Sequence, residues 1–226
     1  MDQKVIKKFQ DKGITILDPR NTYISPDVEI GRGNTIYPNT FLNGKIKIGP
    51  KNILGPNLYL EGKVNIGREN HISFSHIANS KIGSRNIIGP YARLRDNVIL
   101  KNDIKVGNFV ELKNCEVGNR TQIAHLSYIG DAKLGDDVNI GAGTITANFN
   151  SFTNEKNKTT IGDNAATGSN SVLIAPINIG EGAFVAAGSV VNKDIPKNSL
   201  GIARVKQTNK INLISKKKKS KNKKRS

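Results

Sequence analysis

Arg95, Lys113 and His125 are the residues whose types and spacing suggest chemistry. Arg95 and Lys113 are 18 residues apart, and two cations at neighbouring positions repel each other unless an anion lies between them. The pair therefore favours a phosphate-binding site. Histidine exchanges a proton near neutral pH. A lone histidine is more often structural, but the glycine-rich turn GAGT (141–144) and a candidate surface loop follow His125 closely, which favours a catalytic role.

The scaffold for these residues is indicated by an aliphatic side chain at every sixth position. This period fits neither the 3.6-residue turn of an α-helix nor the heptad of a coiled coil, whereas it is typical of a hexapeptide β-helix. In such a fold each repeat is one short strand and a turn, with the aliphatic side chain pointing inward. With occasional five-residue steps, and with Thr167 as the one polar member, the series runs through Ile24, Ile30, Ile36, Leu42, Ile48, Leu54, Leu60, Ile66, Ile72, Ile77, Ile82, Ile88, Leu94, Leu100, Val106, Leu112, Val117, Ile123, Ile129, Leu134, Ile140 and, after a break, Ile161, Thr167, Leu173, Ile179, Val185 and Val191.

Three hexapeptides make one coil of 18 residues, so Arg95 and Lys113 are expected at the same corner of successive coils. The length of the series predicts roughly eight to nine coils. The chain is expected to divide into a short helix and lead-in (1–20), the parallel β-helix (21–194) with a loop projecting at 146–158, and an arm with a Lys-rich tail (195–226).

The helix is predicted over residues 2–12, with Asp2 as its N-cap and Gly13 just beyond its end. Val5 and Phe9, four residues apart, would form its apolar side. At the other end, Pro196 is expected to close the prism.

Composition limits the other properties of the chain. Of 226 residues, 7 are Phe, 5 are Tyr and none is Trp, so an all-β core must be mainly aliphatic. The single cysteine, Cys115, excludes an internal disulfide, and without a long apolar segment we expect a soluble, cytoplasmic protein. The formal charge of +17 owes much to the tail 216–226, which is expected to be a solvated extension that can attract an anionic partner.

A set of motifs resembles a known family: YARLR (91–95), VGNFVELK (106–113), AHLSYIGDAKLGDDVNIGAGTITANFN (124–150), KNKTTIGD (156–163), LIAPINIGEGAFVAAGS (173–189) and IARVKQ (202–207). They are similar to the acetyltransferase half of the bifunctional bacterial N-acetylglucosamine-1-phosphate uridyltransferase/glucosamine-1-phosphate N-acetyltransferase. The resemblance implies a left-handed β-helix that acts as a homotrimer. The family's glycine-rich nucleotide loop has no match in the sequence, so uridyl transfer is not expected.

The resemblance also implies a role for each matching residue. His125 would be the general base that takes a proton from the amine of glucosamine 1-phosphate. The residues that would hold the sugar phosphate are Arg95, Lys113, Tyr128 and Lys156, with Asn139 nearby. Those around acetyl-CoA are Ala142, whose N–H would stabilise the oxyanion, and Asn148, Phe149, Ser169, Ala187 and Arg204. No metal is implied, and the product would be N-acetylglucosamine 1-phosphate for UDP-N-acetylglucosamine and peptidoglycan precursors.

The sequence departs from the family in one loop, where Asn148-Phe149-Asn150-Ser151 replaces the usual Asn-Tyr-Asp-Gly and about two residues are added before Lys156. Three alternatives stay open. A related acyltransferase could act on another amino sugar or an amino acid. A zinc-dependent carbonic anhydrase could use His71, His76 and His125. A non-catalytic β-helix could bind nucleic acid or membrane through its basic tail.

Overall fold

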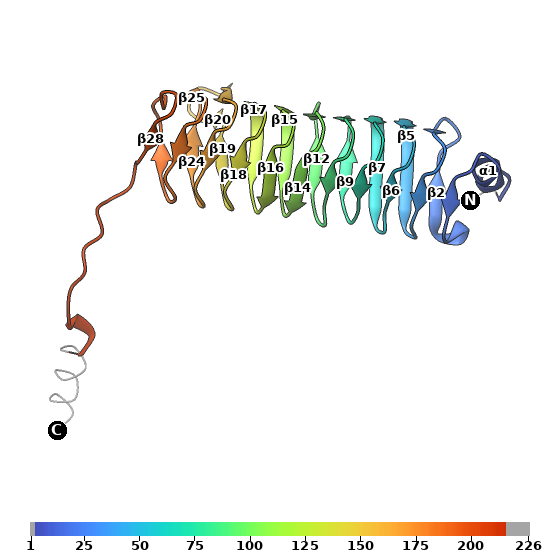
Figure 1. The fold of residues 1–226 in the computed structure, drawn as a ribbon, viewed down its shortest axis with the longest axis horizontal. Coiled ribbons are helices and arrows are strands. Elements are labelled where there is room, and N and C mark those ends of the chain that lie inside the picture. Colours follow the sequence, from blue (N-terminus) through green and yellow to red (C-terminus); the bar gives the residue numbers. More distant parts are fainter. Residues whose placement is uncertain (1–2, 216–226) are drawn as a thin grey trace.

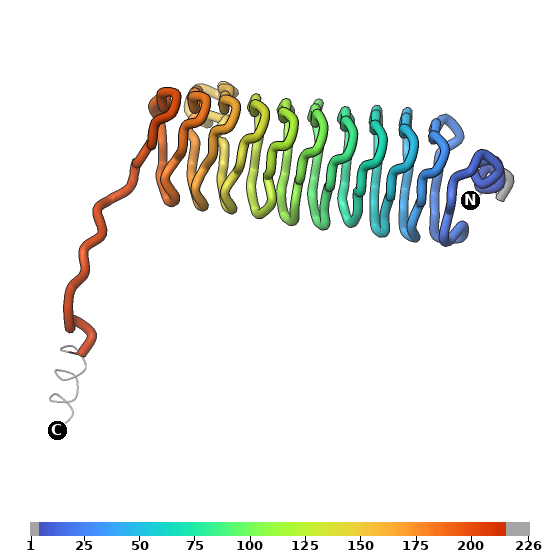
Figure 2. The backbone as a smooth tube through the Cα atoms, in the orientation of Figure 1, coloured from blue at the N-terminus to red at the C-terminus, as the bar shows by residue number. Residues whose placement is uncertain are grey.

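The computed structural model describes residues 3–215, which form one elongated prism with an arm leaving its far end (Figure 1). The coils stack in chain order from the N-terminal end to the C-terminal end, as the tube in Figure 2 shows. The expected N-cap Asp2 and the Lys-rich tail 216–226 lie outside the described residues. None of the helices in the described part is long and apolar enough to cross a membrane.

One face of the prism is a parallel sheet. Within residues 3–215 it has 11 strands. In order they are β1 (Thr15–Ile16), β4 (Thr35–Ile36), β6 (Ile53–Leu54), β8 (His71–Ile72), β11 (Ile87–Ile88), β14 (Lys105–Asn108), β16 (Gln122–His125), β18 (Asn139–Ile140), β23 (Ala166–Thr167), β26 (Phe184–Val185) and β28 (Leu200–Gly201).

The other two faces share a second parallel sheet, which has 15 strands in the described residues. They are β2 (Thr22–Ile24), β3 (Glu29–Ile30), β5 (Thr40–Ile48), β7 (Leu58–Ile66), β9 (His76–Ala78), β10 (Lys81–Ile82), β12 (Arg93–Arg95), β13 (Ile99–Leu100), β15 (Glu111–Val117), β17 (Tyr128–Leu134), β19 (Ile145–Ala147), β22 (Thr159–Ile161), β24 (Val172–Ile174), β25 (Ile177–Ile179) and β27 (Val190–Val191). The long strands turn a corner, because β7 pairs with β9 through its first half and with β10 through its second.

The fold is therefore the predicted all-β, left-handed parallel β-helix. Its register confirms the coil length, since Leu42 pairs with Leu60 and Ile48 with Ile66. The repeat side chains form the core, and only Ile30, in the first coils, is half-buried.

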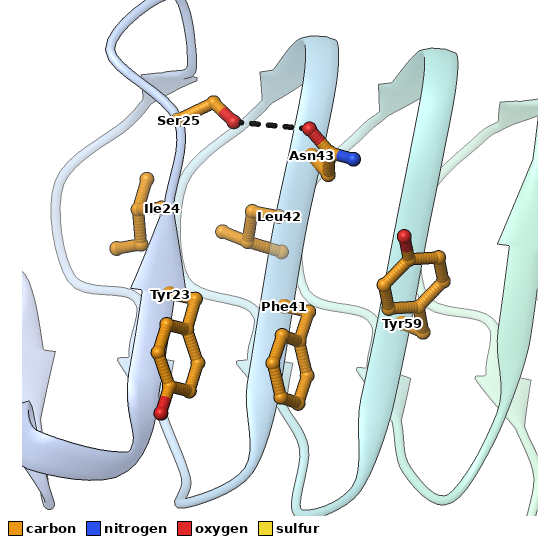
Figure 3. Close-up of a pocket in the computed structure, with 7 residues that line it drawn as sticks. All are labelled: Tyr23, Ile24, Ser25, Phe41, Leu42, Asn43 and Tyr59. Carbon is orange, nitrogen blue, oxygen red and sulfur yellow. Dashed lines mark hydrogen bonds between the residues drawn. The ribbon is translucent and has the colours of Figure 1, made fainter. Parts of the chain in front are cut away.

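The outer side chains alternate with this core. Tyr23, Phe41 and Tyr59 lie outward on β2, β5 and β7, beside the inward Ile24 and Leu42 (Figure 3). The rings of Tyr23 and Phe41 are stacked with centroids 4.6 Å apart. Side chains on one face therefore follow one another at the strand spacing, as the sequence period requires.

The sheet extends beyond the predicted series at both ends, so the estimate of eight to nine coils was too low. At the start, the 3₁₀ helix η1 (Pro19–Asn21) adds residues between Ile16 and Ile24 and hides the first strand from the six-residue count. At the end, Ile195 pairs with Ile179, and β28 adds a strand whose inward position is Gly201. The prism therefore does not close at Pro196 but continues to Gly201, and the arm begins at 202 instead of the predicted 195 (Figure 2).

Two threonines at inward repeat positions, Thr167 and Thr146, form hydrogen bonds within the core. Thr167 accepts from the Gly141 N–H and lies 2.9 Å, oxygen to oxygen, from Thr144. Thr146, six residues after Ile140, also occupies an inward position, and its hydroxyl donates to the Gly130 carbonyl. The apparent break in the repeat therefore begins only after Thr146.

Helix α1 (Gln3–Gln10) closes the N-terminal end of the prism. It agrees with the predicted helix, and Phe9 is buried as expected. Ile6 is the second buried residue, whereas Val5 is only half-buried. The helix thus covers the end of an otherwise open core.

Candidate active site

Arg95 and Lys113 lie in register on β12 and β15, as predicted from their spacing. Arg95 is not an unpaired cation, because its Nε donates to Glu111 Oε1 at 2.7 Å and its Nη1 to Asp96 Oδ2 at 2.8 Å. These contacts, the bond to Glu111 above all, raise the pKa of Arg95. The chain itself supplies anions beside Arg95, so the stacking of the two cations does not by itself indicate a bound phosphate. Lys113, by contrast, makes no ion pair with any described residue.

Tyr128 begins β17, where it pairs with Glu111 of β15. Its ring runs along the strand over Gly130, since any Cβ at position 130 would collide with the phenol oxygen. Gly130 is itself in register with Lys113, so the Tyr128 hydroxyl continues the column of Arg95 and Lys113. Burial raises the pKa of Tyr128, which keeps the phenol neutral and able to donate a hydrogen bond. Sequence reasoning missed Gly130, although a glycine two residues after an outward tyrosine was the available signal.

His125 ends β16, in register with Asn108 of β14. Its Nδ1 lies 3.0 Å from the Asn108 side-chain oxygen. With the amide oxygen of Asn108 facing the ring, Nδ1 is the hydrogen-bond donor and Nε2 of the exposed ring is the nitrogen left to accept a proton. Only Leu126 and Ser127 separate His125 from Tyr128, so the imidazole and the phenol lie on two faces that meet at one corner. Asn108 was not predicted as a site residue.

Small residues continue along the corner beyond His125. Ile123, Ile140, Thr167, Val185 and Gly201 are in register. The residues two positions after Ile140, Thr167 and Val185 therefore stack below His125, and we call this series the small-residue track: Ala142, Ser169 and Ala187.

The track contains three of the residues predicted to bind acetyl-CoA, namely Ala142, Ser169 and Ala187. In the part of the chain that the structure describes, the Ala142 N–H donates to no acceptor, while its carbonyl accepts from the Asn170 N–H at 2.7 Å. Arg204 joins the track from the arm, because its Nη1 donates to the Ala187 carbonyl at 3.0 Å. A free N–H next to the imidazole is the arrangement that an oxyanion requires.

The loop predicted at 146–158 is a projecting hairpin of two short antiparallel strands, β20 (Phe149–Asn150) and β21 (Glu155–Lys156). It stands out from one corner of the prism in Figure 1. Phe149 pairs with Lys156 across the hairpin, and both are exposed. The structure therefore brings these two predicted site residues together.

Two predicted site residues lie away from the places suggested for them. Asn148 is buried beside Tyr128 rather than on the small-residue track, and its amide donates to Asp131. Asn139 is exposed on the 11-stranded sheet, between Gln122 and Ala166, whereas Arg95 and Lys113 belong to the other sheet. Within one chain, Asn139 is therefore not grouped with the cations.

The histidines proposed for a zinc site are not brought together within the chain. His71 and His125 lie on β8 and β16, with β11 and β14 between them, and His76 Nε2 contacts Glu61 Oε1 at 2.9 Å. Across residues 3–215, no group of three His, Cys, Asp or Glu side chains is placed to hold a metal ion. Burial raises the pKa of Cys115 to about 12, so its thiol is not an activated nucleophile.

Comparison with known proteins matches this geometry to a set of relatives. The model of the bacterial transferase hexapeptide family (six repeats) matches residues 158–193. "Bifunctional protein GlmU" of Caldicellulosiruptor saccharolyticus is 48% identical over 207 residues, covering 92% of this chain and 44% of the relative. GlmU of Pseudothermotoga lettingae is 48% identical over 217 residues, covering 96% and 48%. The chain is similar to one half of GlmU.

The chain thus spans about half the length of the curated relatives it matches, and the resemblance inferred from the motifs is confirmed. Among solved structures, LpxA of Bacteroides fragilis, a UDP-N-acetylglucosamine acyltransferase, matches with a TM-score of 0.57 and 20% identity, covering 90% of this chain and 77% of that one. At this identity the likeness to LpxA supports the fold alone.

Proposed function

We propose that the chain transfers the acetyl group of acetyl-CoA to the amine of glucosamine 1-phosphate. The observation that carries this proposal is the setting of His125, whose Nδ1 is held by Asn108 and whose exposed ring stands at the head of the small-residue track. The similarity to GlmU supports the same reaction class. None of the side chains of the small-residue track is a base that could take the amine proton in place of His125.

In the proposed reaction, His125 Nε2 takes a proton from the substrate amine as its nitrogen attacks the thioester carbonyl. A C–N bond forms and the C–S bond breaks, so the coenzyme leaves as a thiolate that then takes the proton from the imidazole. The Ala142 N–H stabilises the negative charge that develops on the carbonyl oxygen, because it has no acceptor within the described residues to give up.

The sugar phosphate would bind around the corner from His125. Lys113 is unpaired within the described residues and continues the column of Arg95, while Tyr128 offers a neutral hydroxyl beside it. Lys156 would approach from the projecting hairpin. Charge-assisted hydrogen bonds of this kind bind phosphate tightly. Binding the phosphate here would position the amine of glucosamine 1-phosphate relative to His125.

A homotrimer is part of the proposal, and an exposed apolar ridge beside His125 supports it. The ridge consists of Phe74, Tyr91, Phe109 and Leu126 at one turn of successive coils, and the last three are 57–63% exposed. All four have left-handed backbone, with φ between 45° and 59°, a conformation that bulky side chains disfavour. Other coils have asparagine or glycine at this turn. A neighbouring prism packed against the ridge would explain why apolar side chains occupy it.

The proposed function is tested by mixing the purified chain with acetyl-CoA and glucosamine 1-phosphate and following thiol release. Glucosamine 6-phosphate is the matched acceptor control, because it carries the same amine and charge with the phosphate elsewhere. We expect rapid thiol release and an N-acetylated product, seen by mass spectrometry, with the 1-phosphate alone. Equal rates with both acceptors would overturn the acceptor assignment, and no release with either would overturn the reaction.

A further inference from the structure

Asp131 lies at the corner from which the projecting hairpin leaves the prism. It stands between Asn114 and Asn148, which occupy the same corner of the coils before and after it. Asn114 Nδ2 donates to Asp131 Oδ1, and Asn148 Nδ2 donates to Asp131 Oδ2. One carboxylate thus joins three successive coils through side-chain hydrogen bonds.

Burying this carboxylate is unusual for the fold. Asp131 is 6% exposed, and it is the one Asp, Glu, Lys or Arg that is buried among residues 5–215. A buried charge is unfavourable unless hydrogen bonds compensate it, and a carboxylate can only accept them. Both oxygens of Asp131 accept from an amide, whereas an asparagine at this position would offer one acceptor oxygen.

The second amide connects Asp131 to the candidate site. Asn148 is the last residue before β20, and its carbonyl accepts from the N–H of Asn157, where the hairpin ends, at 2.8 Å. The Asn148 side chain also lies close enough to the Tyr128 phenol to lower its pKa, against the larger raising effect of burial. Fixing Asn148 therefore fixes both the root of the hairpin and a neighbour of the phenol.

We propose that Asp131 is a positioning residue, which holds Asn148 so that the Tyr128 hydroxyl and Lys156 of the hairpin face the acceptor site. The effect on catalysis rests on the proposed acetyltransferase function, whereas the anchoring of the hairpin does not. Asp131 touches no substrate in this scheme and acts through Asn148.

The test compares Asp131→Ala and Asp131→Asn with Asp136→Ala. Asp136 is the matched control because it accepts from the Asn119 side chain in a similar ladder at a corner without the hairpin. We expect Asp131→Ala to raise KM for glucosamine 1-phosphate by about 10-fold or more with a smaller change in kcat, since binding groups are displaced while His125 stays in place. Asp131→Asn should shift KM less, and Asp136→Ala by less than about twofold.

Limited trypsin digestion gives a readout that is independent of activity. Cleavage after Lys156 reports the hairpin, and cleavage after Lys206 or Lys210 in the exposed arm is the internal reference. Asp131→Ala should speed hairpin cleavage relative to the arm, and Asp136→Ala should not. If Asp131→Ala does not fold, as judged by circular dichroism, Asp131→Asn decides both readouts.

Each outcome separates the inference from the proposed function. Hairpin cleavage unchanged in the folded Asp131 variants would overturn the anchoring, whether or not the wild type is active. Faster cleavage with an unchanged KM would overturn the positioning role. An inactive wild type would overturn the proposed function and with it the catalytic part of the inference, and the trypsin result would then decide the anchoring alone.

Discussion

The hydrogen bond between His125 and Asn108 gives the imidazole its chemical direction. Because Nδ1 is engaged by an amide oxygen, Nε2 is the nitrogen able to accept a proton. The Asn108 side chain is set by the register of β14 and β16, so a residue 17 positions earlier orients the proposed base. Because the His125 ring is exposed, we expect its orientation to depend on this hydrogen bond and not on side chains packed around it.

His125→Ala should lower kcat by about 100-fold, because the attacking amine loses its positioned proton acceptor. Raising the pH should restore part of the rate, since more of the substrate amine is then already deprotonated. Thiol release measured across a pH series checks this. His71→Ala is the control, because His71 also lies outward on the same sheet but on β8. A folded His125→Ala protein with normal kcat at neutral pH would exclude the proposed base.

Arg95→Ala should lower kcat/KM for the sugar phosphate by roughly 10- to 150-fold. The variant loses a cation and also leaves the Glu111 carboxylate without its partner beside the phosphate. Arg85→Ala is the control, since Arg85 makes a similar two-pronged contact with Asp103 at another corner. If Arg95→Ala and Arg85→Ala gave the same kcat/KM, the phosphate would have to bind elsewhere.

At the scale of the element, Gly130 gives β17 its ability to carry the Tyr128 ring. Gly130→Ala should move the phenol, because the new Cβ would occupy the place of the Tyr128 hydroxyl. We expect kcat/KM for the sugar phosphate to fall about 10-fold, the usual order for one lost hydrogen bond to a charged group. The thermal unfolding midpoint should change little, as a tyrosine side chain can swing aside. A large loss of stability with unchanged kinetics would contradict this role.

A buried ladder of asparagines stabilises one corner of the prism, and sequence reasoning missed it. Asn34, Asn52, Asn70 and Asn86 each accept a backbone N–H from the next coil with the side-chain oxygen. The Asn52 amide also donates to the Gly49 and Gly67 carbonyls at 2.9 and 3.0 Å. The ladder thus satisfies backbone groups that the turns leave without strand partners.

Asn52→Ala should therefore lower the free energy of unfolding by about 1–3 kcal/mol, because buried backbone donors and acceptors lose their partners. Denaturant unfolding at a fixed protein concentration measures the change. Asn43→Ala is the control, since Asn43 is exposed, and its expected cost is below about 0.5 kcal/mol. Equal stability of the two variants would show that water replaces the buried amide.

At the scale of the whole molecule, the apolar ridge ends beside His125, and the small-residue track begins in the next coil along the same corner of the prism. Phe109→Lys should shift the sedimentation mass from trimer to monomer and abolish most activity, because a charge in the ridge would be buried against the neighbour. Lysine tolerates left-handed backbone in this fold, as Lys51 shows, so the coil should remain intact. Phe152→Lys, at the fully exposed hairpin tip, is the control for mass. A monomeric wild type would contradict the proposed trimer.

The amino-acid sequence alone was enough to predict the repeat, the inward face, a projecting loop and the stacking of Arg95 on Lys113. The six-residue period marks the inward apolar position of each repeat, and a break in the period marks the loop. Both can be read from neighbouring residues in the chain. The same period failed at η1, at Thr146 and at Gly201, where an insertion or a non-aliphatic residue occupies an inward place. Element ends were therefore harder to predict than the element type.

Only the tertiary structure decided which side chains satisfy one another across coils. Arg95 on Glu111, His125 on Asn108 and Asn148 on Asp131 are each 16 or 17 residues apart, not 18. Five-residue steps and two-residue offsets along a strand produce these pairs, and a count of the main period cannot locate them. These contacts neutralise the charge of Arg95 and orient the His125 imidazole. Both effects depend on the nearest partner in space, which the sequence alone does not show.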